Sequence, residues 1–173
     1  PESLMSITMY GSYVYNLENE RLDISIEKSD KEKITIPKYT GVIKNEYTNA
    51  STTGLVNAEG KTIDKDICDK LGIKADIFGE LNLPSSYIGN FTEEMKAKVG
   101  FDSKVIFCPS HDTASAVVSV PAKGEDFIYI SSGTWSLMGM ELNEPNPTIE
   151  AMNCGFTNEG GTNGKIRFLR NIM

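Results

Sequence analysis

The chain has 173 residues, which is enough for one domain or for parts of two. Its content of 39% hydrophobic and 24% charged residues is typical of a globular protein with a buried core, and excludes the disordered and fibrous classes. The formal net charge of −7 is spread along the chain, and no run of about 18 apolar residues occurs. The sequence therefore predicts neither a nucleic-acid partner nor a membrane span.

The cysteines show no pattern of a disulfide framework or a metal site. Cys68, Cys108 and Cys154 form no CxxC pair, and the chain has a single histidine, so neither a disulfide framework nor a zinc site is predicted. We expect three buried free thiols. No signal-peptide pattern is visible either, and we expect a cytoplasmic protein.

The first predicted elements are strands. Residues 12–15 and the alternating residues 21–26 favour a hairpin, and the charged residues 27–33 favour a solvated turn or helix end. Residues 45–54, rich in hydroxyl and amide side chains that compete with regular structure, predict a loop.

Three short helices are predicted next. Residues 63–71 carry apolar side chains at helical spacing, with Gly72 as a left-handed cap. Residues 75–81 favour a second helix. A third begins at Thr92, a typical N-cap followed by two acidic residues, and ends near Gly100.

A strand, a polar turn and a helix follow as one unit. The apolar residues 105–108 predict a buried strand, residues 109–112 a turn, and residues 113–120 a helix packed against the strand. Beyond a linker, residues 127–130 and 135–140 predict a hairpin joined by the turn 131–134. Residues 141–150 predict a loop, and residues 158–161 a tight turn before a strand at 165–168.

Asp112 is the sharpest chemical candidate. A carboxylate held where an apolar strand meets a helix is rigid and partly shielded from water, as a general base must be. In open α/β sheets, ligands bind at the carboxyl ends of strands, where this turn is expected to lie. The residues alone leave open that Asp112 merely caps its helix and that His111 is a structural residue.

The turn at residues 131–134 is the second candidate. Its hydroxyls and Gly133 could bring backbone N–H groups close to a phosphate, although the sequence contains no Walker motif. An ordinary hairpin of small residues explains the same pattern. The glycine pair at 160–161 marks a turn and is weaker still as a ligand signal.

Four blocks in order, SHDTASAV, SSGTWSLMG, TNEGG and RFLRNIM, resemble FGGY-type sugar kinases, and most closely the rhamnulokinase branch. The segment NEYTNASTTGLVN extends the resemblance to residues 41–173, with Gly54 where the family would have Gln. The resemblance implies an α/β fold of two ribonuclease-H-like lobes, as in actin and hexokinase. Residues 1–121, of which 1–40 match poorly, would end lobe one, and residues 122–173 would begin the ATP-binding lobe two.

The resemblance also implies roles for single residues. Asp112 would accept the proton of the attacking sugar hydroxyl, with His111 and Thr113 beside it on the ketose. Gly133 and Thr134 would contact the ATP phosphates, and Asn171 would approach the sugar and nucleotide from lobe two. ATP and Mg²⁺ are the implied cofactors, with no protein metal ligands singled out, because Mg²⁺ takes few of them.

The implied reaction is phosphorylation of L-rhamnulose to L-rhamnulose 1-phosphate by ATP. Another ketose such as L-fuculose is the alternative, and a truncated, inactive sugar-binding remnant is a second one. The first phosphate loop and the Gly-rich adenosine region of the family do not occur in these residues. We therefore expect no kinase activity from the chain alone; its oligomeric state stays open.

Overall fold

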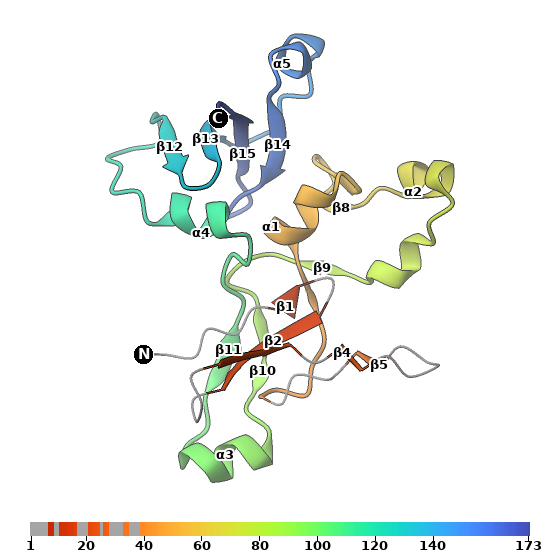
Figure 1. Ribbon diagram of the computed structural model, residues 1–173, viewed down its shortest axis with the longest axis vertical. Coiled ribbons are helices and arrows are strands. Elements are labelled where there is room, and N and C mark those ends of the chain that lie inside the picture. Colours follow the sequence, from red (N-terminus) through yellow and green to blue (C-terminus); the bar gives the residue numbers. More distant parts are fainter. Residues whose placement is uncertain (1–6, 9–10, 17–20, 25, 28–32, 35–38) are drawn as a thin grey trace.

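The computed structural model describes residues 39–173 in full and, before them, the backbone of five short strands (Figure 1). These strands are β1 (Ile7–Thr8), β2 (Gly11–Asn16), β3 (Arg21–Ile24), β4 (Ile26–Glu27) and β5 (Lys33–Ile34). Strands β1, β2 and β3 form one antiparallel sheet, with Tyr13 opposite Ile24. The predicted hairpin is confirmed. Most of the predicted charged turn, residues 28–32, lies outside the described residues.

The segment predicted as a loop, residues 45–54, is instead regular, so that prediction is wrong. It forms β6 (Asn45–Glu46), α1 (Tyr47–Ala50) and the 3-10 helix η1 (Ser51–Thr53), and Gly54 ends it with a left-handed φ of 74°. The hydroxyls do bond nearby backbone, but as helix partners: the Ser51, Thr52 and Thr53 hydroxyls each donate to the carbonyl three residues earlier. Such bonds are compatible with helical turns.

The predicted helix near residue 65 is confirmed as α2 (Lys65–Leu71), capped by Asp64 and ended by Gly72 at φ 69°. It follows the small hairpin of β7 (Val56–Asn57) and β8 (Thr62–Ile63). The next predicted helix is only the 3-10 helix η2 (Ala75–Phe78), because the chain turns into β9 (Leu81–Asn82), which pairs in parallel with β6.

Helix α3 (Glu93–Val99) is confirmed with Thr92 as its N-cap, and it joins β10 (Tyr87–Asn90) to β11 (Lys104–Ile106). The prediction of a buried strand here is wrong. Strand β11 pairs antiparallel with β10 in a two-stranded ribbon, and Ile106 is 57% exposed. Ile88 and Phe107 form the buried hydrophobic cluster of this region, with Val42 and Val105 packed against them. The polar turn therefore follows a ribbon rather than a strand of an open sheet.

Helix α4 (Asp112–Val118) follows that turn and packs against β12 (Tyr129–Ser132), not against the preceding strand as predicted. Strands β12 and β13 (Ser136–Leu142) form the predicted hairpin. They continue into a four-stranded antiparallel sheet in the order β12-β13-β15-β14, which contains β14 (Thr157–Gly160) and β15 (Ile166–Asn171). Residues 158–160 thus belong to a strand, and the predicted turn begins only at Gly161.

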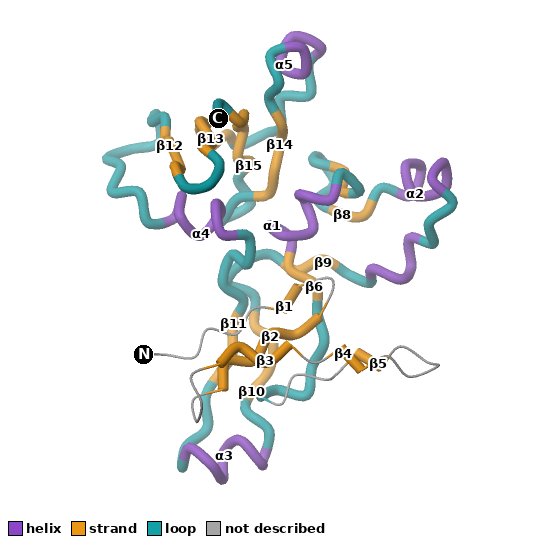
Figure 2. Tube along the Cα trace, viewed as in Figure 1, coloured by secondary structure: helices purple, strands orange, loops and turns teal. Residues whose placement is uncertain are grey.

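The molecule is elongated, with α3 near one end and α5 (Ile149–Asn153) at the other, and α1, α4 and β14 lie between them (Figure 1). The helices are short and separated by loops (Figure 2). Among the helices of the described residues, none combines the length and apolar character needed to cross a bilayer.

The three cysteines are free, as predicted, but their expected burial holds only for Cys68. Cys108 is partly buried, and Cys154 is exposed at the end of α5.

Candidate active site

Residues 109–113, the turn before α4 together with the first two residues of that helix, present Asp112 to solvent; we call this segment the His111 turn. The Asp112 side chain is 96% exposed, so the prediction that this carboxylate is partly shielded from water is wrong for the chain by itself. Its Oδ1 accepts hydrogen bonds from the backbone N–H of Thr113 at 2.6 Å and from the Thr113 hydroxyl at 3.4 Å. His111 occupies the N-cap position, without a side-chain capping bond. Asp112 is therefore the first residue of α4 rather than its N-cap, although it bonds a backbone N–H of the first turn, and its role as a base stays a prediction. Its second carboxylate oxygen accepts no hydrogen bond from the described residues.

A buried carboxylate holds the His111 turn from one side. Glu46 is 1% exposed and accepts hydrogen bonds from the backbone N–H of Ser110 at 3.1 Å and from the Ser110 hydroxyl at 2.7 Å. It also caps α1 through the backbone N–H of Thr48 at 2.9 Å, and the Thr48 hydroxyl in turn accepts from the backbone N–H of His111 at 3.3 Å. Glu46 thus ties the His111 turn to α1 with charge-assisted hydrogen bonds, the stronger kind.

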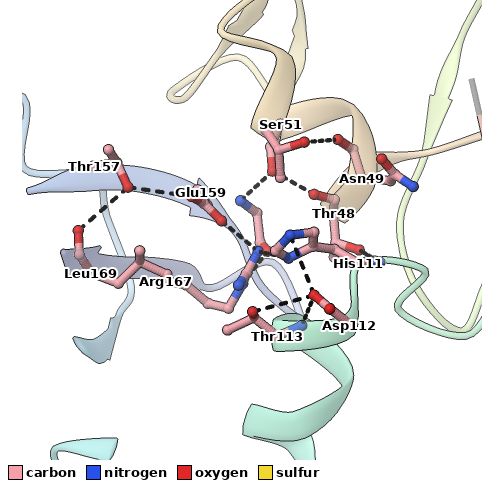
Figure 3. A network of polar contacts seen from close by, with 12 residues as sticks. Thr48, Asn49, Ser51, His111, Asp112, Thr113, Thr157, Glu159, Arg167 and Leu169 are labelled. Carbon is pink, nitrogen blue, oxygen red and sulfur yellow. Dashed lines mark hydrogen bonds and ion pairs between the residues drawn. The ribbon is translucent and has the colours of Figure 1, made fainter. Parts of the chain in front are cut away.

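A buried guanidinium holds the same turn from the other side (Figure 3). Arg167, on β15, is 0% exposed; its Nε donates to the Gly160 carbonyl at 2.8 Å, and its Nη2 donates to Glu159 Oε2 at 3.0 Å. The same Nη2 lies 3.2 Å from Nδ1 of His111. A buried charge needs such partners, and here they come from β14 and from the His111 turn.

The sheet and α1 are packed closely at this point. The Gly160 backbone N–H donates to the Ser51 hydroxyl at 2.7 Å, and a Cβ at Gly160 would lie 2.6 Å from the Tyr47 ring. Tyr47 is 1% exposed, and burial raises the pKa of its phenol. Glycine is therefore required at residue 160 by close approach rather than by turn geometry.

The imidazole of His111 is biased toward its neutral form. Burial, and after it the Arg167 guanidinium, hold the pKa of His111 below its usual value, against the opposing charges of Glu159, Asp112 and Glu46. Burial disfavours the charged form of any base.

The second candidate was predicted at residues 131–134, but Ser131 and Ser132 belong to β12, so the turn itself is residues 133–135. We call it the Gly133 turn, and it is open by comparison. The Gly133 N–H donates to the Trp135 carbonyl at 2.8 Å, and the hydroxyls of Ser132 and Ser136 lie 3.0 Å apart. Gly133, Thr134 and Trp135 are exposed, and none of the described residues accepts a hydrogen bond from the Thr134 hydroxyl. The Gly133 N–H is used within the turn, so the Thr134 hydroxyl is the donor left for a phosphate group.

The sequence-predicted residues fall into two groups. Asn171 lies beside the Gly133 turn, because it is opposite Leu137, and Ser136 exchanges backbone hydrogen bonds with Ile172 and Met173. His111, which Asp112 and Thr113 follow directly, contacts Arg167 instead, four residues before Asn171 on β15. Four residues of strand span about 13 Å. The two groups are thus anchored near opposite ends of one strand.

Four residues of this network were missed from the sequence: Glu46, Thr48, Glu159 and Arg167. Glu46 and Thr48 fell in a segment predicted as a loop, and Glu159 in a turn. The available signal was a charged residue inside an apolar strand, Arg167 between Ile166 and Phe168, with an acidic residue in the strand before it. No group of three or more metal-ligating side chains occurs within the described part of the chain.

Comparison with known proteins gives relatives and a family. The chain is 48% identical over 165 residues to the rhamnulokinase of Halalkalibacterium halodurans, covering 92% of this chain and 35% of that protein. It is 45% identical over 134 residues to the rhamnulokinase of Bacteroides thetaiotaomicron, covering 77% and 28%. The chain therefore spans about a third of the length of the curated relatives it matches.

Solved structures show the same fold. The ligand-bound xylulose kinase of Lactobacillus acidophilus superposes with a TM-score of 0.63 at 21% identity, covering 77% of this chain and 27% of that one. The gluconate kinase of the same organism gives 0.64 at 20% identity, covering 78% and 27%. The predicted fold class, α/β of the actin and hexokinase type, is confirmed.

The profile of the N-terminal domain of the FGGY family of carbohydrate kinases matches residues 32–119. That span contains the His111 turn and all of α4. The division of the chain at residues 121 and 122 stays a prediction. With half of its residues under this profile and its fold shared with two sugar kinases, the chain belongs to the FGGY family of carbohydrate kinases.

Proposed function

We propose that this chain is the part of an ATP-dependent ketose kinase that presents the catalytic base, with L-rhamnulose as substrate and L-rhamnulose 1-phosphate as product. The observation that carries the proposal is the exposed carboxylate of Asp112 on a turn held by two buried charges. The relatives named above are rhamnulokinases, which supports the choice of sugar. The three free cysteines support a cytoplasmic location, since thiols stay reduced there.

Asp112 is the proton acceptor in this proposal. Phosphoryl transfer depends mostly on positioning and on neutralising phosphate charge, with one carboxylate to receive the hydroxyl proton. The open oxygen of Asp112 takes that proton while the sugar oxygen attacks the terminal phosphorus and ADP leaves. His111 and Thr113, on either side of Asp112, contact the ketose.

The Gly133 turn holds the phosphates in this proposal. Its free Thr134 hydroxyl supplies a neutral donor, and Asn171 lies beside the turn for a contact to sugar or nucleotide. Bound Mg²⁺ neutralises phosphate charge and needs few protein ligands. It would reach the site on ATP.

A chimera tests the proposal. The matching third of the Halalkalibacterium halodurans rhamnulokinase is replaced by this chain, and ADP release with Mg-ATP is measured on L-rhamnulose and L-fuculose, with the parent enzyme as control. We expect kcat/KM on L-rhamnulose within about tenfold of the parent, which corresponds to a loss of at most about 1.4 kcal/mol in transition-state stabilisation.

The other outcomes decide between alternatives. A chimera that unfolds cooperatively and binds L-rhamnulose without releasing ADP would identify this segment as a sugar-binding remnant. Preference for L-fuculose over L-rhamnulose, when the parent prefers L-rhamnulose, would replace the assigned ketose.

A further inference from the structure

Arg167 and His111 contact each other in only one protonation arrangement. A guanidinium has N–H donors and no acceptor, so the Nδ1 of His111 must accept the hydrogen bond at 3.2 Å. In a neutral imidazole the proton is then on Nε2. A doubly protonated imidazole would set an N–H against an N–H, so protonation of His111 breaks this contact.

The proton on Nε2 faces the proposed base. His111 Nε2 lies 3.6 Å from Asp112 Oδ1, which is longer than a hydrogen bond and short enough to close on ligand binding. A neutral imidazole can donate there to the carboxylate or to a sugar oxygen. An imidazolium at the same place would stabilise the Asp112 carboxylate and make it a weaker base.

The other neighbours of His111 favour the imidazolium. Glu159 on β14, Asp112 on α4 and Glu46 on β6 all bring negative charge to the ring. Arg167 on β15 supplies the opposing positive charge. It also forms an ion pair with Glu159, whose side chain is 18% exposed, and this pairing offsets the negative charge that Glu159 brings to His111.

We propose that Arg167, oriented by Glu159, is a positioning residue that holds His111 as the neutral Nε2–H tautomer beside Asp112. The role in catalysis rests on the kinase function proposed above, whereas the tautomer does not. Neither Arg167 nor Glu159 needs to touch the substrate. The β14–β15 hairpin thereby sets the protonation state of the His111 turn, which is about 50 residues earlier in the chain.

Nuclear magnetic resonance tests the tautomer directly, because His111 is the only histidine in the 173-residue chain and its ring signals need no assignment. Correlations between ring protons and ring nitrogens report which nitrogen is protonated. We expect the Nε2–H tautomer and titration below the ordinary value of about 6.5. In Arg167→Met, titration moves to higher pH and the tautomer preference is lost.

The matched control is Arg170→Met, which removes an arginine from the same strand. Arg170 lies over the Phe156 ring at 5.8 Å and does not contact His111. We expect Arg170→Met to leave the tautomer and the titration of the His111 ring unchanged. If Arg167→Met does not fold, two milder variants test the same contact. Arg167→Lys keeps the positive charge without the planar guanidinium, and Glu159→Gln keeps a hydrogen-bond acceptor without the negative charge. We expect Arg167→Lys to move the His111 titration upward, because the hydrogen bond to Nδ1 is lost, and Glu159→Gln to move it downward, because a negative charge beside the ring is removed.

Kinetics in the chimera test the role in catalysis. Arg167→Met lowers kcat about 100-fold, the effect of a small misplacement of reacting groups, with a smaller change in the KM for sugar. It also moves the acid limb of the kcat profile to higher pH. Arg170→Met does neither.

Three results would overturn the inference: a proton on Nδ1 in the wild-type chain, an unchanged His111 titration in the Arg167 and Glu159 variants, or a kcat in Arg167→Met equal to that of Arg170→Met. An inactive chimera contradicts the proposed function instead, and the resonance measurements still decide the tautomer.

Discussion

The His111 turn and the Gly133 turn differ in how firmly they are held. The first is fastened by Glu46 on one side and Arg167 on the other, both buried, and Asp112 is its most exposed residue. The second is an exposed hairpin turn with an unused hydroxyl donor at Thr134. A base must stay within tenths of an ångström of the proton it accepts, so its backbone is fixed. A phosphate contact needs available donors more than it needs rigidity.

The largest expected effect separates chemistry from stability within the His111 turn. Asp112→Asn in the chimera lowers turnover by about 10²–10⁴, the range of general acid–base catalysis, and leaves the affinity for sugar nearly unchanged. Its melting temperature stays that of the unsubstituted chimera, because the side chain is exposed. Steady-state kinetics and thermal unfolding measure both. Unaltered turnover removes Asp112 from its assigned role.

The next effect concerns stability alone. Glu46→Ala leaves the backbone N–H groups of Thr48, Asn49 and Ser110 without their acceptor, and we expect a loss of about 3 kcal/mol in the free energy of unfolding. Denaturant unfolding of the chain measures it.

Glu93→Ala is the control for this loss, because Glu93 pairs with Lys96 on the surface with its side chain 90% exposed. Surface pairs contribute little. Equal stability of the two variants would show that Glu46 does not hold the His111 turn.

Two glycine substitutions compare the turns more finely. Gly160→Ala drives a Cβ to 2.6 Å from the Tyr47 ring, and overpacking of this kind costs about 2 kcal/mol. Gly133→Ala meets nothing closer than the Trp135 carbonyl oxygen at 3.9 Å, so we expect a change below about 0.5 kcal/mol. Denaturant midpoints of both variants against the wild type check the difference. The comparison fails if Gly133→Ala is the more destabilising of the two.

The smallest expected effect on the kinetics is at the Gly133 turn. Thr134→Val keeps the side-chain shape and removes one hydroxyl donor, so the KM for ATP in the chimera rises about fivefold, as for one hydrogen bond worth about 1 kcal/mol. Stability and the KM for sugar stay as they are. A KM for ATP equal to that of the unsubstituted chimera would argue against a phosphate contact by this hydroxyl.

Local patterns predicted the elements that depend on neighbouring residues. Thr92 caps α3 and Gly72 ends α2, as the sequence indicates, because capping needs only residues within one turn. The prediction of a loop at residues 45–54 was wrong for a different reason. Their hydroxyls suit loops and helix ends equally well, and the buried Glu46 carboxylate that caps α1 decides between them.

The strand at residues 104–106 shows a different failure. Its apolar run predicts burial, yet β11 pairs only with β10 in the described part of the chain and leaves Ile106 exposed. Whether an apolar strand is buried depends on what covers its two faces, and periodicity does not reveal that.

The sequence by itself determined the helices α2, α3 and α4, the β12–β13 hairpin, the prominence of Asp112 and, through four ordered blocks, the resemblance to sugar kinases. Only the tertiary structure decided that Glu46 and Arg167 converge on the His111 turn from 64 and 56 residues away. The physical reason is the separation along the chain over which each kind of interaction acts. Caps, turns and periodicity act between neighbouring residues, whereas a buried charge is stable only where distant strands bring its partners to it.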